Sequence, residues 1–115
     1  MPYLKLNTNV TITDQQSPKL LSDLSKLMAQ ETGKPERYVL VELVENKAML
    51  FAGTGGSIAY LECKSIGLSA SQAKSISAAV SKLLKESLQV DGDRIYIEFS
   101  NCPGEFWGWN GSTFG

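Results

Sequence analysis

The sequence predicts one α+β domain, an α/β sandwich in which two pseudo-symmetric β-α-β units form a four-stranded sheet with two helices on one face. A chain of 115 residues has the size of a single domain, so residues 1–115 are treated as one unit. An internal repeat predicts the two units: Ser25–Met28 recurs as Ser81–Leu84, and Val39–Leu43 recurs as Ile95–Phe99. In both copies an amphipathic helical pattern precedes an apolar strand.

The first unit opens with a strand over Pro2–Asn7, followed by a helix. Ser17 is the expected N-cap, and Pro18 fits the first helical position, where its missing N–H is not needed. Gly33 is the expected C-terminal stop. Apolar residues at helical spacing form the stripe that faces the sheet: Leu20, Leu24, Leu27 and Met28.

The second unit opens with a strand over Ile58–Lys64. Ser69 with Gln72 three residues later is a capping box, and the helix should end near Val90, before the turn residues Asp91-Gly92. A strand over Ile95–Phe99 completes the unit.

Two further segments are expected to add short strands: Lys47–Phe51, before the glycine-rich run Gly53–Gly56, and the tail Phe106–Trp109.

The face of the sheet away from the helices carries information about assembly. Alternation places Tyr96 and Glu98 on one face of the last long strand, and Leu40 and Glu42 on one face of its counterpart. Both faces carry apolar residues, yet two right-handed crossovers cover only one of them. We therefore expect the second face to pack against other subunits.

Composition excludes several function classes. The chain has no histidine, which excludes Ser-His and Cys-His catalysis and the usual zinc sites, and we expect no metal and no cofactor. Cys63 and Cys102 are not spaced as a dithiol centre. A formal net charge of −1 with intermixed signs does not favour binding to nucleic acid or to an anionic membrane. No signal peptide or transmembrane span is visible, so the default expectation is a cytoplasmic protein.

The second residue is a proline. Removal of Met1 next to such a small residue is expected to expose the secondary amine of Pro2. An α-amino group titrates near pH 8, and burial disfavours its charged form, so a partly desolvated terminal proline would be a base at neutral pH. The simpler interpretation is that many proteins begin Met-Pro.

Five motifs in order resemble the macrophage migration inhibitory factor and D-dopachrome tautomerase family of the tautomerase superfamily. They are Pro2 with Asn7-Thr8-Asn9-Val10, Thr32-Gly33-Lys34-Pro35, Ser65-Ile66-Gly67, Asp93-Arg94-Ile95-Tyr96-Ile97 and Gly108-Trp109-Asn110-Gly111-Ser112-Thr113-Phe114. The resemblance implies a homotrimer with active sites between subunits. It also implies cofactor-free keto–enol tautomerisation of α-keto acids such as phenylpyruvate and, in some members, isomerisation of dopachrome derivatives.

The resemblance also assigns roles. Pro2 is the expected general base, Lys34 the cation for a substrate carboxylate, and the backbone N–H of Ile66 a substrate contact. Tyr96 is expected to come from the neighbouring subunit. Each of the last three also has a simpler interpretation when taken alone. Lys34 would be a solvated loop lysine, Ile66 part of a turn that ends a strand, and Tyr96 a tyrosine packed in an interface.

Aromatic residues are expected to wall the pocket. Tyr38 and Phe114 match family positions, although each would also suit a core. Trp107 stands where an aliphatic residue is expected, and either lines the pocket mouth or seals a subunit contact. Glu98 replaces the common asparagine, which puts substrate preference in question. The position also suits a solvated or lysine-paired carboxylate that repeats Glu42.

Two alternatives remain open. The first is a cytokine-like signalling or interaction protein with vestigial tautomerase activity. The second is a related dehalogenation or decarboxylation, which the presence of only two arginines, Arg37 and Arg94, disfavours. Ile58–Leu61 replaces the C-x-x-C motif of the animal cytokine, so its thiol oxidoreductase activity is not expected.

Overall fold

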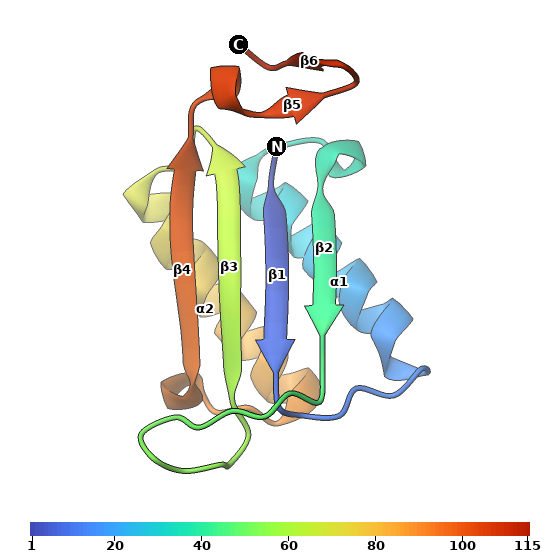
Figure 1. Ribbon diagram of the computed structural model, residues 1–115, viewed down its shortest axis with the longest axis vertical. Coiled ribbons are helices and arrows are strands. Elements are labelled where there is room, and N and C mark those ends of the chain that lie inside the picture. Colours follow the sequence, from blue (N-terminus) through green and yellow to red (C-terminus); the bar gives the residue numbers. More distant parts are fainter.

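The computed structural model describes residues 1–115 and consists of a four-stranded sheet with two helices on one face. Figure 1 shows both helices behind the sheet and a small hairpin beyond one end of it. The main strands are β1 (Tyr3–Thr8), β2 (Leu40–Val44), β3 (Ala59–Ile66) and β4 (Ile95–Cys102), and the helices are α1 (Gln16–Thr32) and α2 (Ala70–Leu88). The predicted fold class is confirmed.

The strand order β2-β1-β3-β4 reflects the internal repeat. Strand β1 is parallel to β2, and β3 is parallel to β4, so each helix is the crossover of one β-α-β unit. The two units join through the antiparallel pair β1 and β3, in which Leu4 lies opposite Cys63 and Leu6 opposite Leu61.

The core lies between the sheet and the helices. Leu4 and Leu6 of β1 are fully buried against the helical stripes, which repeat every three or four residues as predicted. The buried apolar residues of the helices are Leu20, Leu24 and Met28 of α1 and Ile76, Val80, Leu84 and Leu88 of α2. Each such side chain contributes about 1.5–3 kcal/mol through burial. The helices are amphipathic, and none has the length and apolar content needed to cross a membrane.

Both helices begin with the same reciprocal hydrogen bonds. The Ser69 box is confirmed: its N–H donates to Gln72 Oε1 at 2.9 Å, and the Gln72 N–H donates to Ser69 Oγ at 3.1 Å. Thr13 and Gln16 make the same pair of bonds, at 3.0 and 3.1 Å. The prediction of Ser17 as the N-cap is therefore wrong, because Thr13-x-x-Gln16 satisfies the free N–H groups one turn earlier. The predicted stop at Gly33 is confirmed by its left-handed φ of 69°.

The segment Lys47–Phe51 is not the predicted strand. Asn46, with a φ of 58°, turns the chain out of the extended conformation after β2. Phe51 only forms a bridge to Thr54, with two backbone hydrogen bonds of 3.0 Å. The connection between β2 and β3 is thus a loop.

The tail forms a hairpin that is separate from the main sheet. Strand β5 (Gly108–Trp109) pairs with β6 (Ser112–Thr113) and leaves the main sheet at four strands. Asn110 and Gly111, with φ angles of 51° and 80°, form the tight turn between them. Two positive φ angles in an Asn-Gly pair are typical of a type I′ turn. Figure 1 shows this hairpin next to the N-terminus.

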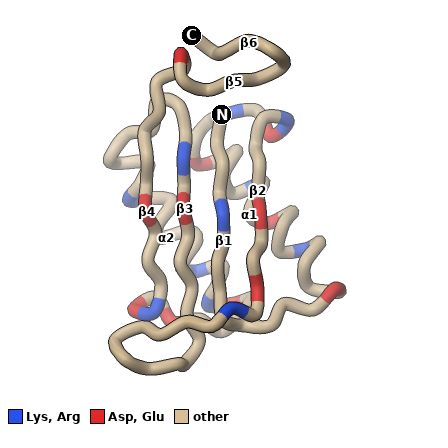
Figure 2. Tube along the Cα trace, in the orientation of Figure 1, with Lys and Arg blue, Asp and Glu red and all other residues tan.

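The sheet face opposite the helices carries apolar residues, as expected, together with charged ones. A row of charged residues crosses its middle: Lys5 lies level with Glu42 on one side and Glu62 on the other, and Glu62 lies level with Glu98. Figure 2 shows acidic and basic positions along the central part of the strands. Apolar and aromatic side chains flank this row, namely Tyr3, Leu40, Tyr60, Ile66 and Tyr96.

Candidate active site

Pro2 lies at the head of β1 and is fully buried. Its carbonyl accepts a 3.0 Å hydrogen bond from the Leu40 N–H, which extends the ladder between β1 and β2 by one residue. Tyr3 pairs with Lys64, so Pro2 continues the antiparallel ladder to the level of Ser65. With Met1 attached, the nitrogen of Pro2 is an amide, and the free amine belongs to Met1.

The environment of the chain terminus favours a neutral amine. Burial, reinforced by the charge of Lys34, lowers the pKa of the Met1 α-amino group below its ordinary value of 8.0. Lys34 follows Gly33 at the end of α1, where its N–H donates to Thr32 Oγ1 at 3.3 Å. The fold therefore brings together two predicted site elements, Lys34 and the start of β1.

Three aromatic rings pack together beside the terminus. Tyr38 meets Trp109 edge-on with centroids 5.4 Å apart and Phe114 edge-on at 5.9 Å, while Trp109 stacks on Phe114 at 5.8 Å. These rings, with Met1 and Trp107, line a cavity of about 180 Å³. The predicted residues Tyr38, Trp107 and Phe114 thus lie on one cavity wall, and the structure adds Arg37, whose guanidinium lies 4.8 Å from the Tyr38 ring centroid.

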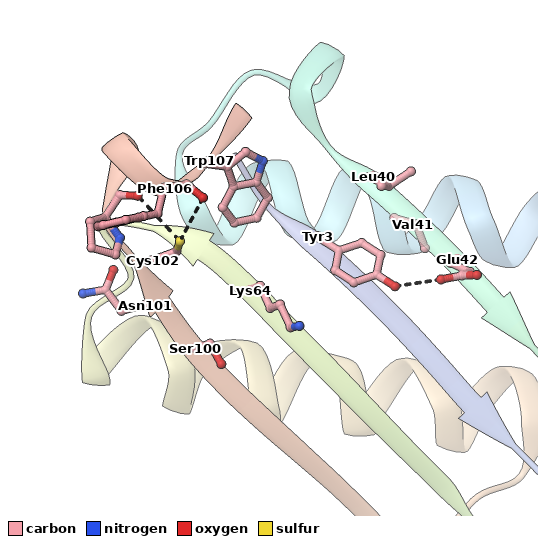
Figure 3. A pocket seen from close by; sticks show the side chains of 11 residues that line it. Tyr3, Leu40, Val41, Glu42, Lys64, Ser100, Asn101, Cys102, Phe106 and Trp107 are labelled. Atoms are coloured by element: carbon pink, nitrogen blue, oxygen red, sulfur yellow. Dashed lines mark hydrogen bonds between the residues drawn. The ribbon is translucent and has the colours of Figure 1, made fainter. Parts of the chain in front are cut away.

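A larger hollow of about 890 Å³ opens next to this cavity, on the sheet face away from the helices. Trp107 lines both spaces. Figure 3 shows the Tyr3 hydroxyl donating to Glu42, at 2.7 Å, on the floor of the hollow. This bond, helped by burial and by the charges of Glu42 and Glu62, raises the pKa of Tyr3 to about 12. Tyr3 therefore stays protonated at neutral pH.

Ile66 ends β3, one residue beyond the level of Pro2. It pairs with Cys102 of β4, and Gly67 then turns the chain with a φ of 72°. This places Ile66 at the same end of the sheet as Pro2 and Lys34. Its neighbour Ser65 holds the one buried side-chain oxygen in the structure that lacks a hydrogen-bond partner.

Tyr96 and Glu98 lie far from Pro2 within the chain. Tyr96 pairs with Tyr60, and Glu98 with Glu62, both well below the level of Ser65 on β3. At about 3.3 Å per residue, Tyr96 is roughly 17 Å along the sheet from Pro2. Both side chains point to the open face, and Tyr96 is 65% exposed. One chain alone does not bring these residues together with the proline.

The two thiols are separate. Cys63 is buried in the core, and burial raises its pKa to about 11. Cys102 lies at the end of β4 beside the larger hollow, where its thiol approaches the carbonyl oxygens of Pro103 and Phe106 (Figure 3). No group of three or more Cys, Asp or Glu side chains is arranged to hold a metal ion.

Sequence reasoning missed two residues next to Tyr96. The ring of Phe51 lies 4.6 Å from the Tyr96 ring, and the guanidinium of Arg94 lies 5.2 Å from the Phe51 ring. The alternation of β4 gave no sign of either contact, because Phe51 reaches Tyr96 through a loop.

Comparison with known proteins identifies the family. The model of the macrophage migration inhibitory factor (MIF) family matches residues 1–115. A macrophage migration inhibitory factor from Meriones unguiculatus is 37% identical over 115 residues, with 99% of each chain covered. The crystal structure of a homologue from Prochlorococcus marinus is 38% identical with a TM-score of 0.92, covering 98% of this chain and 99% of that one. The factor from Toxoplasma gondii is 32% identical, also with a TM-score of 0.92, over 97% and 99%. The matches extend over nearly the whole chain in sequence and in fold, and the chain therefore belongs to the macrophage migration inhibitory factor family.

Proposed function

We propose that the chain is a cofactor-free keto–enol tautomerase of α-keto acids such as phenylpyruvate, with Pro2 as the general base once Met1 is removed. The observation that carries the proposal is the lowered pKa of the terminal amine, which results from burial and from Lys34. Removal of Met1 would leave the secondary amine of Pro2 beside the same lysine and the same aromatic cavity. A base whose pKa lies near the working pH is the most effective proton carrier.

The reaction moves one proton from carbon to oxygen. The Pro2 nitrogen would take the proton from the carbon next to the ketone. The electron pair of the C–H bond would form the carbon–carbon double bond, and the π pair of the carbonyl would move to its oxygen. The enolate oxygen then receives a proton, returned by Pro2 directly or through water, so no oxidant, reductant or cofactor is consumed. Donors aimed at the developing enolate would lower the barrier.

The surrounding residues fit this chemistry. Lys34 would hold the substrate carboxylate, and the Ile66 N–H would donate to the substrate from the end of β3. Tyr38, Trp107 and Phe114 would enclose an aromatic substrate ring, since they line the cavity at the terminus. In that arrangement the carboxylate also offsets the Lys34 charge, so substrate binding would raise the pKa of Pro2.

We also propose a homotrimer whose active sites lie between subunits. Tyr96 lies about 17 Å along the sheet from Pro2 of its own chain and Glu98 about 10 Å, and β3 separates their strand from β1. Both side chains are exposed, so we assign them to the site of a neighbouring subunit. Sedimentation of the protein at micromolar concentration should therefore give the mass of three chains. A monomer would contradict this site, because Tyr96 would then have no proline to act with.

The activity is tested with phenylpyruvate and protein whose Met1 removal is verified by mass spectrometry. The processed protein should convert the enol and keto forms without added metal or cofactor. Pro2→Gly should lower kcat/KM by about 10²–10⁴-fold, the usual contribution of general acid–base catalysis. Lys26→Gln, an exposed position on α1, serves as the matched control and should keep full activity. Unchanged activity of Pro2→Gly would rule out the proline as the base.

A further inference from the structure

The guanidinium of Arg94 ties together the loop between β2 and β3. Its Nη1 donates to the Phe51 carbonyl and to Thr54 Oγ1, each at 2.8 Å. Its Nη2 donates to the Thr54 carbonyl at 3.1 Å, and longer bonds of 3.5 Å reach the carbonyls of Gly56 and Ser57. One side chain thus organises most of the turn that separates β2 from β3.

Arg94 has this role in place of an ion pair. The ion pairs of the chain join Lys19 to Asp23 and Lys85 to Asp91, and neither includes Arg94. The N–H groups of the Arg94 guanidinium therefore donate to oxygen atoms of the loop. A planar fork of five N–H groups can reach several carbonyls at once, which a lysine ammonium cannot do in the same geometry.

The loop needs such support because of its backbone. Ala52 has a φ of 53° and Gly53 a φ of 75°, so the turn at Phe51–Thr54 includes a left-handed alanine. Asn9 holds the other side of the loop, since its amide donates to the carbonyls of Gly55 and Gly56. Without Arg94, the Phe51–Thr54 bridge and the 3.2 Å hydrogen bond from Thr54 Oγ1 to the Phe51 carbonyl would remain to fix the first half of the turn.

The ring of Phe51 connects Arg94 to Tyr96. The Arg94 guanidinium lies over the Phe51 ring at 5.2 Å, and that ring lies 4.6 Å from Tyr96 with an interplanar angle of 49°. Phe51 and Tyr96 also line one apolar cavity of about 270 Å³. Tyr96 is largely exposed, with Tyr60 beside it on β3, and Phe51 is the aromatic ring in contact with it.

We propose that Arg94 is a positioning residue: it anchors Phe51, and Phe51 fixes the orientation of the Tyr96 ring that the neighbouring subunit's active site uses. This inference rests on the proposed tautomerase function and its intersubunit site. A small displacement of a substrate-contacting group can cost about 100-fold in rate, so an exposed tyrosine needs a rigid support. The arrangement Arg94–Phe51–Tyr96 supplies that support from within one chain.

The test measures kcat and KM for phenylpyruvate in Arg94→Lys and Phe51→Leu, alone and combined with Tyr96→Ala. Each single variant should lower kcat/KM about tenfold, because the ring loses its support. In the Tyr96→Ala background neither should lower it further, since no ring remains to be positioned. Lys47→Ala is the control, because this residue lies on the same loop and its side chain makes no hydrogen bond or ion pair in the structure.

Hydrogen exchange of the Phe51 and Thr54 amides gives a readout that does not depend on activity. Arg94→Lys should speed their exchange, whereas Lys47→Ala should not. If Tyr96→Ala loses activity while Arg94→Lys and Phe51→Leu remain fully active, the positioning role is wrong and the proposed function stands. Losses that add to that of Tyr96→Ala would also overturn it, because they would reflect general destabilisation. An inactive wild-type protein would overturn the proposed function, and this inference with it.

Discussion

Lys34 lies close enough to the start of the chain for its charge to act on the α-amino group of Met1. The pKa of that amine is lowered first by burial and then by Lys34. Because α1 ends at Thr32 and β1 begins at Tyr3, this relationship joins two elements whose ends lie far apart in the sequence. The two groups that meet here, the chain terminus and Lys34, both belong to the first β-α-β unit.

Replacing Lys34 should therefore raise the pKa of the terminal amine that we propose as the base. A positive neighbour disfavours the ammonium form, so its removal favours protonation and shifts the acid limb of the pH profile to higher pH. We expect Lys34→Gln to raise the apparent pKa in kcat/KM for phenylpyruvate and to raise KM, with Lys26→Gln as an exposed control. An acid limb that stays in place would show that Lys34 does not act on the base.

Glu98 should have the opposite electrostatic effect if it faces a neighbour's proline. It is exposed on the open face and lies level with Glu62, with Tyr96 two residues away on the same face. A carboxylate favours the protonated amine, so Glu98→Asn should lower the apparent pKa of Pro2, and the change will be small where water screens the charge. It should also improve turnover of dopachrome methyl ester relative to phenylpyruvate.

The measurement for Glu98 is a pair of pH profiles of kcat/KM, one for each protein. Glu86→Gln, on the exposed side of α2, controls for a general change in net charge. A pKa that rises or does not move in Glu98→Asn would leave Glu98 as a repeat of Glu42 with no role at the base.

Ser65 and Thr8 make a matched pair for stability. Ser65 Oγ is buried without a partner, whereas Thr8 Oγ1 is buried, donates to the Ile58 carbonyl at 2.6 Å and accepts from the Val10 N–H at 3.1 Å. An unpaired buried hydroxyl costs about 1–3 kcal/mol. Ser65→Ala should therefore increase the free energy of unfolding by about 1 kcal/mol, and Thr8→Val should decrease it by a similar amount.

Urea denaturation at one fixed protein concentration checks this pair, because an oligomer's stability depends on concentration. If Ser65→Ala destabilises the protein as much as Thr8→Val does, the Ser65 hydroxyl has a partner in solution.

The sequence was sufficient to predict the elements that depend on local patterns. The repeated apolar spacing predicted both helices and the four long strands, and Ser69-x-x-Gln72 located the start of α2. The same rule applied to Thr13-x-x-Gln16 would have located the start of α1, and Asn110-Gly111 would have indicated the terminal hairpin. The start of α1 and the terminal hairpin were therefore both predictable from local sequence patterns.

Other features could not be predicted because they depend on tertiary contacts. The loop after β2 takes its shape from Arg94, a residue remote in sequence, so local propensity could not identify it. The grouping of Tyr38, Trp109 and Phe114 likewise depends on how the tail hairpin lies against the end of the sheet. The separation of Tyr96 from Pro2 follows from strand register, which alternation alone does not fix.

The most direct test of the account compares one protein with and without Met1. Both forms are prepared from the same sequence, their masses are verified, and kcat/KM for phenylpyruvate is measured under identical conditions. The account predicts that the form with a free Pro2 amine is active, and that the form retaining Met1, whose Pro2 nitrogen is an amide, is slower by about 10²-fold or more. Equal activity of the two forms would contradict the claim that the Pro2 amine is the base.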